Sequence, residues 1–136
     1  MITFLPLPSF EESAKVLDRR RLGCQRGECL LLLKTLAGED TRWINHPIIS
    51  MWRGHEQALA VYGCSICVEW KRRGYKDSTH ERIMDYMDSE KYPIVYPVWD
   101  ERLYASHRAA LLYKAPEWYS QFGWEEEPKI EYWWGE

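Results

Sequence analysis

The sequence contains no long hydrophobic run. No stretch approaches the roughly 20 consecutive apolar residues that span a bilayer. The opening residues, MITFLPLPSF, lack the basic segment and the small-residue cleavage site of a signal peptide. We therefore expect a cytoplasmic protein with no membrane association, in a compartment where disulfides are rare.

Several catalytic and metal-binding motifs are also missing. The chain has no HExxH sequence, no paired-carboxylate box and no glycine-rich phosphate loop. A nuclease built on metal-bound carboxylates is therefore poorly supported, and we expect no metal and no cofactor. Four cysteines at positions 24, 29, 64 and 67 leave a four-thiolate zinc site open as an alternative. Both pairs fall inside helical patterns, which favours buried free thiols.

Positive charge is not in excess. The chain has 18 Lys and Arg against 21 Asp and Glu, a formal net charge of −3, which argues weakly against a nucleic-acid partner. The distribution is uneven, however, because six Glu and a single Lys occupy the stretch from Glu117 to the end. An acidic tail beside a body with clustered basic residues is compatible with a moderate, salt-sensitive DNA binder.

Aromatic residues are abundant, with eight Trp and nine Tyr in 136 residues. Such side chains combine a large apolar face with a polar tip and often mark binding surfaces. For any one of these residues, the alternative to a place on a binding surface is burial in an aromatic-rich core.

The sequence pattern predicts an all-α protein, a single compact bundle of about four main helices spanning residues 1–136. Pro6 and Pro8 make residues 1–8 an extended arm, and Ser9 with Glu12 forms a capping box for a short helix to Leu17. The main helices are expected over 18–37, 47–73 with a break near Gly54, 78–89, and 100–114. A short helix from Pro116 to Gly123 and an acidic aromatic tail, about 124–136, complete the chain.

Basic residues gather in two places. Arg19, Arg20 and Arg21 open the first long helix, with Arg26 two turns after Arg19, and Lys71, Arg72 and Arg73 end the second. Together with Arg53 they could line one phosphate-contacting surface, although a solvated helix end also accounts for the second cluster. Glu28 lies at the margin of the apolar face of the first long helix. It is there either as a partly buried acid or base, or as the partner of an arginine in a structural ion pair.

Four segments in order resemble the pyrimidine-dimer DNA glycosylase (endonuclease V) family, in its bacterial and phage branch. Leu17-Asp18-Arg19-Arg20-Arg21-Leu22 with Glu28 is similar to an L-D-x-K-x-L motif followed by a glutamate. Asn45-His46-Pro47 with Gly54-His55, the run Glu69–Tyr75 and the run Ser106–Tyr119 resemble three further motifs. The resemblance covers residues 1 to about 124.

The resemblance implies a glycosylase with AP-lyase activity acting on damaged or modified pyrimidines in double-stranded DNA. The α-amine of Met1 would be the nucleophile, since an α-amine has a reference pKa near 8 and is partly neutral at physiological pH. Glu28 would stabilise the developing charge or move protons, Trp118 and Tyr119 would stack near an extruded base, and His46 and His107 would support the site. Ile2 and Gly27 depart from the family pattern. We expect a monomer; the alternative is a non-catalytic nucleic-acid- or protein-binding module on the same scaffold.

Overall fold

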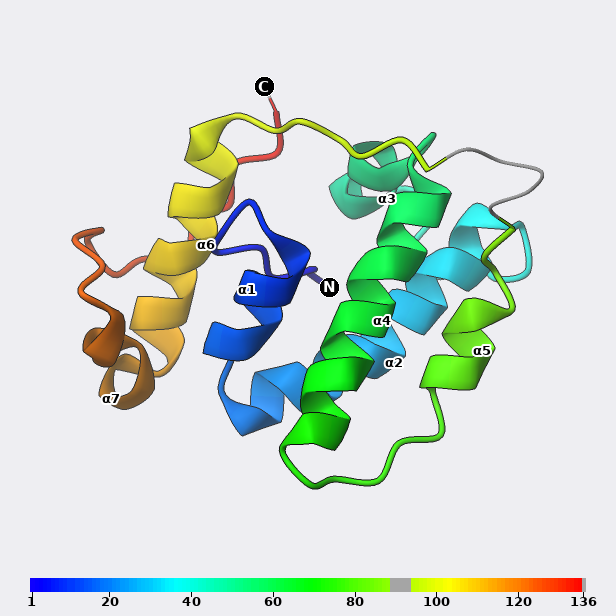
Figure 1. Cartoon of the computed structure of the whole chain (residues 1–136). Coiled ribbons are helices and arrows are strands. Elements are labelled where there is room, and N and C mark those ends of the chain that lie inside the picture. Colours follow the sequence, from blue (N-terminus) through cyan, green and yellow to red (C-terminus); the bar gives the residue numbers. More distant parts are fainter. Residues whose placement is uncertain (89–93, 136) are drawn as a thin grey trace.

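A computed structural model describes residues 1–88 and 94–135, and its regular secondary structure in these ranges is entirely helical (Figure 1). The all-α class predicted from the sequence is therefore confirmed. No helix in the described part of the chain is long and apolar enough to cross a membrane. The elements are α1 (Phe10–Val16), α2 (Arg19–Leu36), α3 (Pro47–Trp52), α4 (Glu56–Arg72), α5 (His80–Met84), α6 (Glu101–Lys114), α7 (Pro116–Tyr119) and the 3₁₀ turn η1 (Ser120–Phe122).

Most helix boundaries follow from local sequence signals. The Ser9 hydroxyl accepts a hydrogen bond from the Glu12 amide, and Asp100 accepts one from the Arg102 amide, so both side chains cap their helices. Gly38 ends α2 and Gly54 separates α3 from α4, each with a positive φ that other residues rarely adopt. These boundaries were predicted.

Two boundary predictions need correction. The third main helix, expected to reach Ser89, ends as α5 at Met84, while residues 89–93 lie outside the described part. Asp18 occupies the N-cap position of α2, but its side chain makes no capping bond. Its carboxylate instead accepts hydrogen bonds from the Tyr119 hydroxyl and from Arg21, which ties α7 to the start of α2.

The core forms where α2 packs against α4. The predicted apolar face of α2 is buried at Leu22, Cys29 and Leu33. Gly63 on α4 permits this close approach, because a Cβ at that position would lie 2.5 Å from the Cys29 sulfur. Van der Waals contact begins well beyond that distance, so a side chain there would force the two helices apart.

The N-terminal arm is extended, as predicted, and runs through the interior. Ile2, Phe4 and Leu5 are all less than 10 % exposed. The arm joins no sheet, so its polar backbone groups are bonded by side chains of the surrounding helices: Leu5 donates to His107 Nδ1 over 2.8 Å, and the Pro6 carbonyl accepts from Arg108 over 2.8 Å. The start of the chain is therefore held firmly inside the fold.

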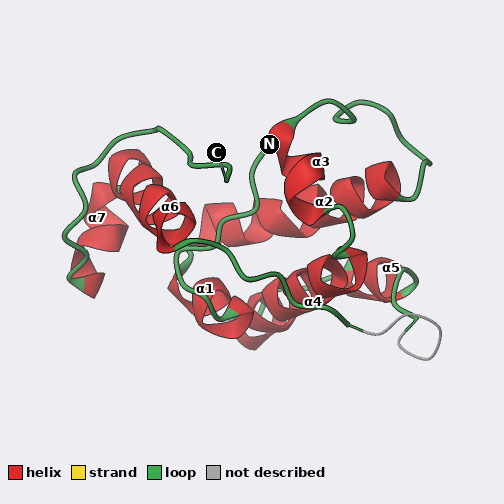
Figure 2. Cartoon of the chain, turned by 90° about the horizontal axis from the view of Figure 1, so that it is seen from above, coloured by secondary structure: helices red, strands yellow, loops and turns green. Residues whose placement is uncertain are grey.

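The C-terminal segment folds back along α6. The Lys129 amide donates to the Ala109 carbonyl, and the Trp133 amide donates to the Ser106 hydroxyl. Figure 2 shows that both chain ends lie on one side of α2, while α4 lies on the other. The two termini and the α2 surface between them therefore share one face of the molecule.

Candidate active site

Gln25 of α2 fastens the N-terminal arm to the helix that carries Glu28. Its side chain is almost fully buried. The amide oxygen accepts from the Phe4 amide over 3.1 Å, and the amide nitrogen donates to the Ile2 carbonyl over 3.0 Å and to Glu28 Oε2 over 2.9 Å. The Tyr62 hydroxyl lies 2.8 Å from both the Phe4 carbonyl and Gln25 Oε1. One glutamine thus fixes both the path of the arm and the orientation of the carboxylate.

The Glu28 carboxyl is half-buried and lies within range of the positive charge of the Met1 α-amine. Burial raises its pKa, and the positive N-terminus, the hydrogen bond from Gln25, the Ile2 amide and Lys114 each pull the pKa partly back. In the described residues no arginine forms an ion pair with Glu28, because Arg21 binds Asp18 and Arg26 binds Asp77. The structural ion pair considered as an alternative from the sequence does not form. A carboxyl with a raised pKa next to an amine is suited to proton transfer.

His46 also lies within range of the charge of this amine. It precedes α3, where its Nδ1 accepts from the Ile48 amide over 3.1 Å. Partial burial lowers the pKa of its ring, and the positive N-terminus lowers it further, so the imidazole is favoured in its neutral form. The structure therefore brings Met1, Glu28 and His46 together from the arm, α2 and the start of α3.

A basic groove of about 440 Å³ adjoins this site. It is lined by Arg19, Arg20 and Arg21 from the start of α2, by Lys114 at the end of α6 and by Trp118 on α7. Ala115 and the two acidic residues Asp18 and Glu117 complete the lining, so cations outnumber carboxylates four to two. Trp118 donates from its indole nitrogen to the Val16 carbonyl over 2.8 Å and remains partly exposed. Cations and an aromatic ring in one groove suit a phosphate backbone with an adjacent base.

Other predicted DNA contacts have structural partners in this fold. Tyr119 is fully buried and its ring stacks on Trp124, so it has no free face for a base. Arg26 lies over the Trp70 ring at 4.5 Å and bonds Asp77 over 2.6 Å, which holds the loop before α5. Both side chains position neighbouring elements.

The second basic cluster does not line this groove. Glu69 accepts hydrogen bonds from both Arg72 and Arg73, at 2.6 to 2.8 Å, and the two guanidiniums hold its pKa below the usual value. Arg73 also donates to the Lys15 carbonyl at the end of α1. Lys71 and Arg53 are exposed, at the ends of α4 and α3. None of these four basic residues is among those that line the groove.

His107 on α6 has a structural role. The residue is fully buried, and burial lowers the pKa of its ring to about 3. Its Nδ1 accepts from Leu5, while Nε2 has no hydrogen-bond partner. A ring that stays neutral throughout the physiological range cannot exchange protons there, so His107 anchors the arm.

The zinc alternative finds no support in the described residues. No group of three or more His, Cys, Asp or Glu side chains lies close enough together there to hold a metal ion. Cys24 is exposed, whereas Cys29 and Cys67 are buried with the pKa of each thiol raised by burial.

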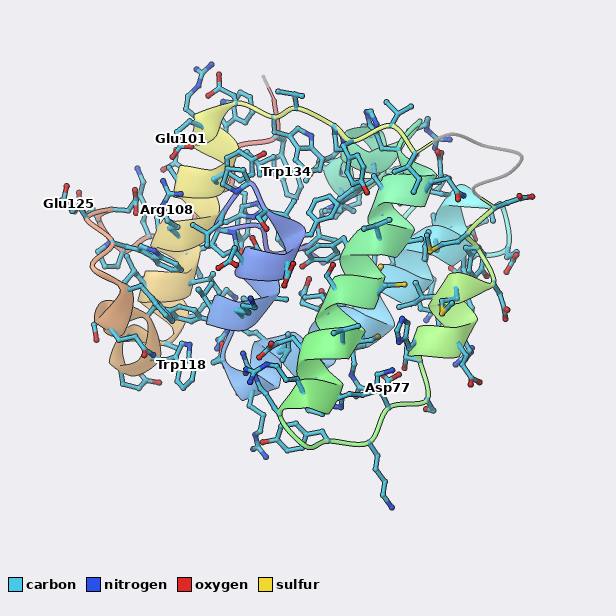
Figure 3. The ribbon with its side chains drawn as sticks, in the orientation of Figure 1. Asp77, Glu101, Arg108, Trp118, Glu125 and Trp134 are labelled. Carbon is cyan, nitrogen blue, oxygen red and sulfur yellow. The ribbon has the colours of Figure 1, made fainter. Side chains whose placement is uncertain are left out.

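Sequence reasoning missed four residues of this region: Gln25, Lys114, Tyr132 and Trp134. Tyr132 lies near Glu28 and Arg21, whose charges affect its phenol, and the Trp134 ring packs edge-on against His46 at 5.5 Å. Figure 3 shows Trp134 and Trp118 toward opposite ends of α6. No local pattern marks these residues, because each contact joins parts of the chain that are far apart in sequence.

Comparison with known families gives one match. The profile of a family described as pyrimidine dimer DNA glycosylase matches residues 1–82, more than half of the chain. These residues include the arm, Gln25, Glu28, His46 and both arginine-rich helix ends. The comparisons with curated proteins and with solved structures gave no match.

Proposed function

The chain belongs to the pyrimidine dimer DNA glycosylase family, and we propose that it releases modified pyrimidines from double-stranded DNA and then nicks the strand as an AP lyase. In this proposal it acts as a monomer, with the α-amine of Met1 as nucleophile and Glu28 as the acid, base and electrostatic stabiliser. The observation that supports the proposal is the buried N-terminal arm, which brings the amine within range of the Glu28 carboxylate on α2.

The arm supplies the nucleophile at little entropic cost. Its first residues are buried and bonded to Gln25, so the amine is already confined beside Glu28 before any substrate binds. Preorganisation of this kind lowers the barrier of a bimolecular attack. Met1 itself is only partly buried, and in this proposal its amine is open to a sugar carbon.

Each step can be assigned to a group of this site. The amine nitrogen forms a bond to C1′ as the bond from C1′ to the base breaks; the base leaves with the electron pair, and the proton that the nitrogen loses neutralises it. The C1′–O4′ bond then breaks, O4′ takes up a proton, and the nitrogen lone pair completes a protonated imine at C1′. The half-buried Glu28 stabilises the positive charge that develops on the sugar and the resulting imine. It then accepts the C2′ proton as the 3′ phosphate leaves. Arg19, Arg20 and Lys114 hold the strand by its phosphates.

The test is borohydride trapping on a duplex with one abasic site. Wild-type protein should form a covalent adduct, and acetylation of the N-terminus should abolish it. Glu28→Gln should bind the duplex normally and nick it at least tenfold more slowly, while Glu11→Gln on the exposed face of α1 should match wild type. Binding without any adduct would favour a non-catalytic nucleic-acid-binding module instead.

A further inference from the structure

An aromatic cleft lies between α1, α4 and the segment 94–99, which crosses from the side of α4 to the start of α6 (Figure 1). The cleft has a volume of about 340 Å³, and none of its lining residues lines the basic groove. Four aromatic side chains and two prolines make up more than half of its lining: Phe10, Tyr96, Trp99, Tyr104, Pro8 and Pro97. The cleft is therefore a second concave surface, which the proposed chemistry does not use.

The rings of this cleft are held in place by the core. Phe10 packs against Trp52 and Tyr62, with ring centroids 6.1 and 5.6 Å away. Tyr96 packs in turn against Phe10 at 6.0 Å. Trp99 packs edge-on against Trp52 at 4.9 Å. Since Trp52 and Tyr62 are fully buried, a partner meets rings that are already fixed, which keeps the ordering cost of binding low.

Two of these rings carry hydrogen-bond donors at the surface. Within residues 1–88 and 94–135, neither the indole nitrogen of Trp99 nor the hydroxyl of Tyr96 bonds another group of the protein. Tyr96 is 55 % exposed, and Trp99 is partly exposed. Donors beside apolar rings suit a chain that offers carbonyl oxygens and apolar faces. A polyproline II segment does so, because its carbonyls have no internal partner and proline has no N–H group to satisfy.

The aromatic cleft opens into a second cleft along α4. This cleft has a volume of about 460 Å³, shares Glu11, Val61 and Ser65 with the first, and continues to Val68 and Arg72. The stretch of α4 from Val61 to Arg72 is about 16 Å long at 1.5 Å per residue, which about five residues of polyproline II span at 3.1 Å each. The two clefts therefore form one elongated groove, which fits an extended chain.

Glu11 gives this groove a negative charge where the two clefts meet. Among the described residues that line the aromatic cleft, Glu11 alone is charged. Its side chain is 75 % exposed and pairs with Lys15 over 3.4 Å. An exposed pair of this kind contributes at most about 1 kcal/mol, so a cation of a partner can replace Lys15. The groove therefore favours a basic residue beside the apolar ones.

We propose that this groove binds a proline-rich extended segment of a partner protein, with prolines against Phe10, Tyr96 and Trp99 and a basic residue beside Glu11. Aromatic-lined grooves accept such segments because polyproline II is preformed and loses little conformational entropy on binding. The inference goes beyond the proposed glycosylase function and does not depend on it, since the groove shares no residue with the candidate active site.

The experiment titrates the full chain, isotope-labelled for NMR, with a peptide of one arginine followed by about eight prolines. The indole signal of Trp99 should shift and saturate with a Kd near or below about 1 mM. A peptide of equal length and charge, with glycine and serine in place of proline, should bind at least about tenfold more weakly. Glu11→Gln should weaken binding of the arginine peptide about twofold to fivefold and leave binding of the same peptide without arginine unchanged.

Two variants separate the rings from their donors. Trp99→Phe keeps a ring and removes the N–H group, so the Kd should rise about twofold to tenfold. Tyr96→Leu removes both a ring and a hydroxyl and should raise the Kd about tenfold or more. Tyr113→Leu is the matched control, because Tyr113 is 60 % exposed on α6 and does not line the groove. That variant should leave the Kd unchanged.

Other outcomes overturn the inference. No saturable shift up to about 10 mM peptide, or equal affinities for the two peptides, would show that the groove does not recognise proline. Unchanged binding in both Trp99→Phe and Tyr96→Leu would place the peptide elsewhere on the protein. A protein that dimerises in sedimentation experiments and becomes monomeric on Val68→Asp would assign the groove to a second copy of the chain instead.

Discussion

Replacing Gln25 by methionine tests the link between the arm and the site. The side chain is almost fully buried, and methionine fills a similar volume without hydrogen bonds. The Phe4 amide and the Ile2 carbonyl both lose the partner they have in the structure, whereas Tyr62 retains the Phe4 carbonyl. An unsatisfied buried group costs about 1–3 kcal/mol, so the variant should lose about 2–6 kcal/mol of the free energy of unfolding.

The same change should impair chemistry beyond its effect on folding. A loosened arm no longer confines the Met1 amine, and Glu28 loses the donor that orients it. At a temperature where urea titrations show the variant folded, the rate of borohydride adduct formation should fall about tenfold or more.

Thr35→Val is the control, because Thr35 is equally buried on the same helix but bonds only the Leu31 carbonyl of its own helix. That variant should lose about 1 kcal/mol and keep full activity. A Gln25→Met protein as stable and as active as Thr35→Val would refute the account of the arm.

Three further predictions concern packing, pH and charge. Gly63→Ala, whose Cβ would press on the Cys29 sulfur, should lower the free energy of unfolding by about 1–3 kcal/mol. Gly27→Ala, whose Cβ would meet nothing within 4 Å, should raise it by about 0.5–1 kcal/mol. Urea titrations measure both values, and the opposite order would contradict the packing of α2 on α4. Because burial lowers the folded-state pKa of His107 to about 3 from 6.5, its contribution to stability is complete above pH 6.5 and declines by about 1.4 kcal/mol per pH unit between pH 6.5 and 3. His107→Asn should flatten that decline, and parallel curves for the two proteins would show that the ring is not the cause. Replacing Arg19 and Arg20 by glutamine should reduce the slope of log Kd for DNA against log salt concentration by up to about two. The same change at Lys71 and Arg72, the exposed basic residues that end α4, should leave this slope unchanged. Equal slopes in both variants would show that the DNA-binding surface lies elsewhere.

Local signals in the sequence were sufficient for the helices and for the place of Glu28. Capping residues and positive-φ glycines mark most helix ends, and the spacing of apolar residues places Glu28 at the margin of the buried face of α2. Pro6 and Pro8 mark the arm as extended. The ion pairs at the end of α4 could also have been predicted, because Glu69 stands three and four residues before Arg72 and Arg73, which is the spacing of helical ion pairs.

The remaining features depend on contacts between distant segments. Gln25 binds residues 21, 23 and 37 positions away along the chain, and its own position on α2 gives no sign of them. Tyr119 resembles a stacking residue in an exposed aromatic run, yet it is buried and its hydroxyl donates a hydrogen bond to the Asp18 carboxylate. The return of the C-terminal segment along α6 depends on single contacts with Ser106, Ala109 and Arg108, none of which forms a pattern in the sequence.

The most direct test of the central claim is to map the residue that carries the borohydride-trapped DNA adduct by mass spectrometry. The reduced sugar is expected on the α-nitrogen of Met1 in the first proteolytic peptide. An adduct on Lys114, the lysine whose charge acts on Glu28, would contradict the claim that the buried arm supplies the nucleophile.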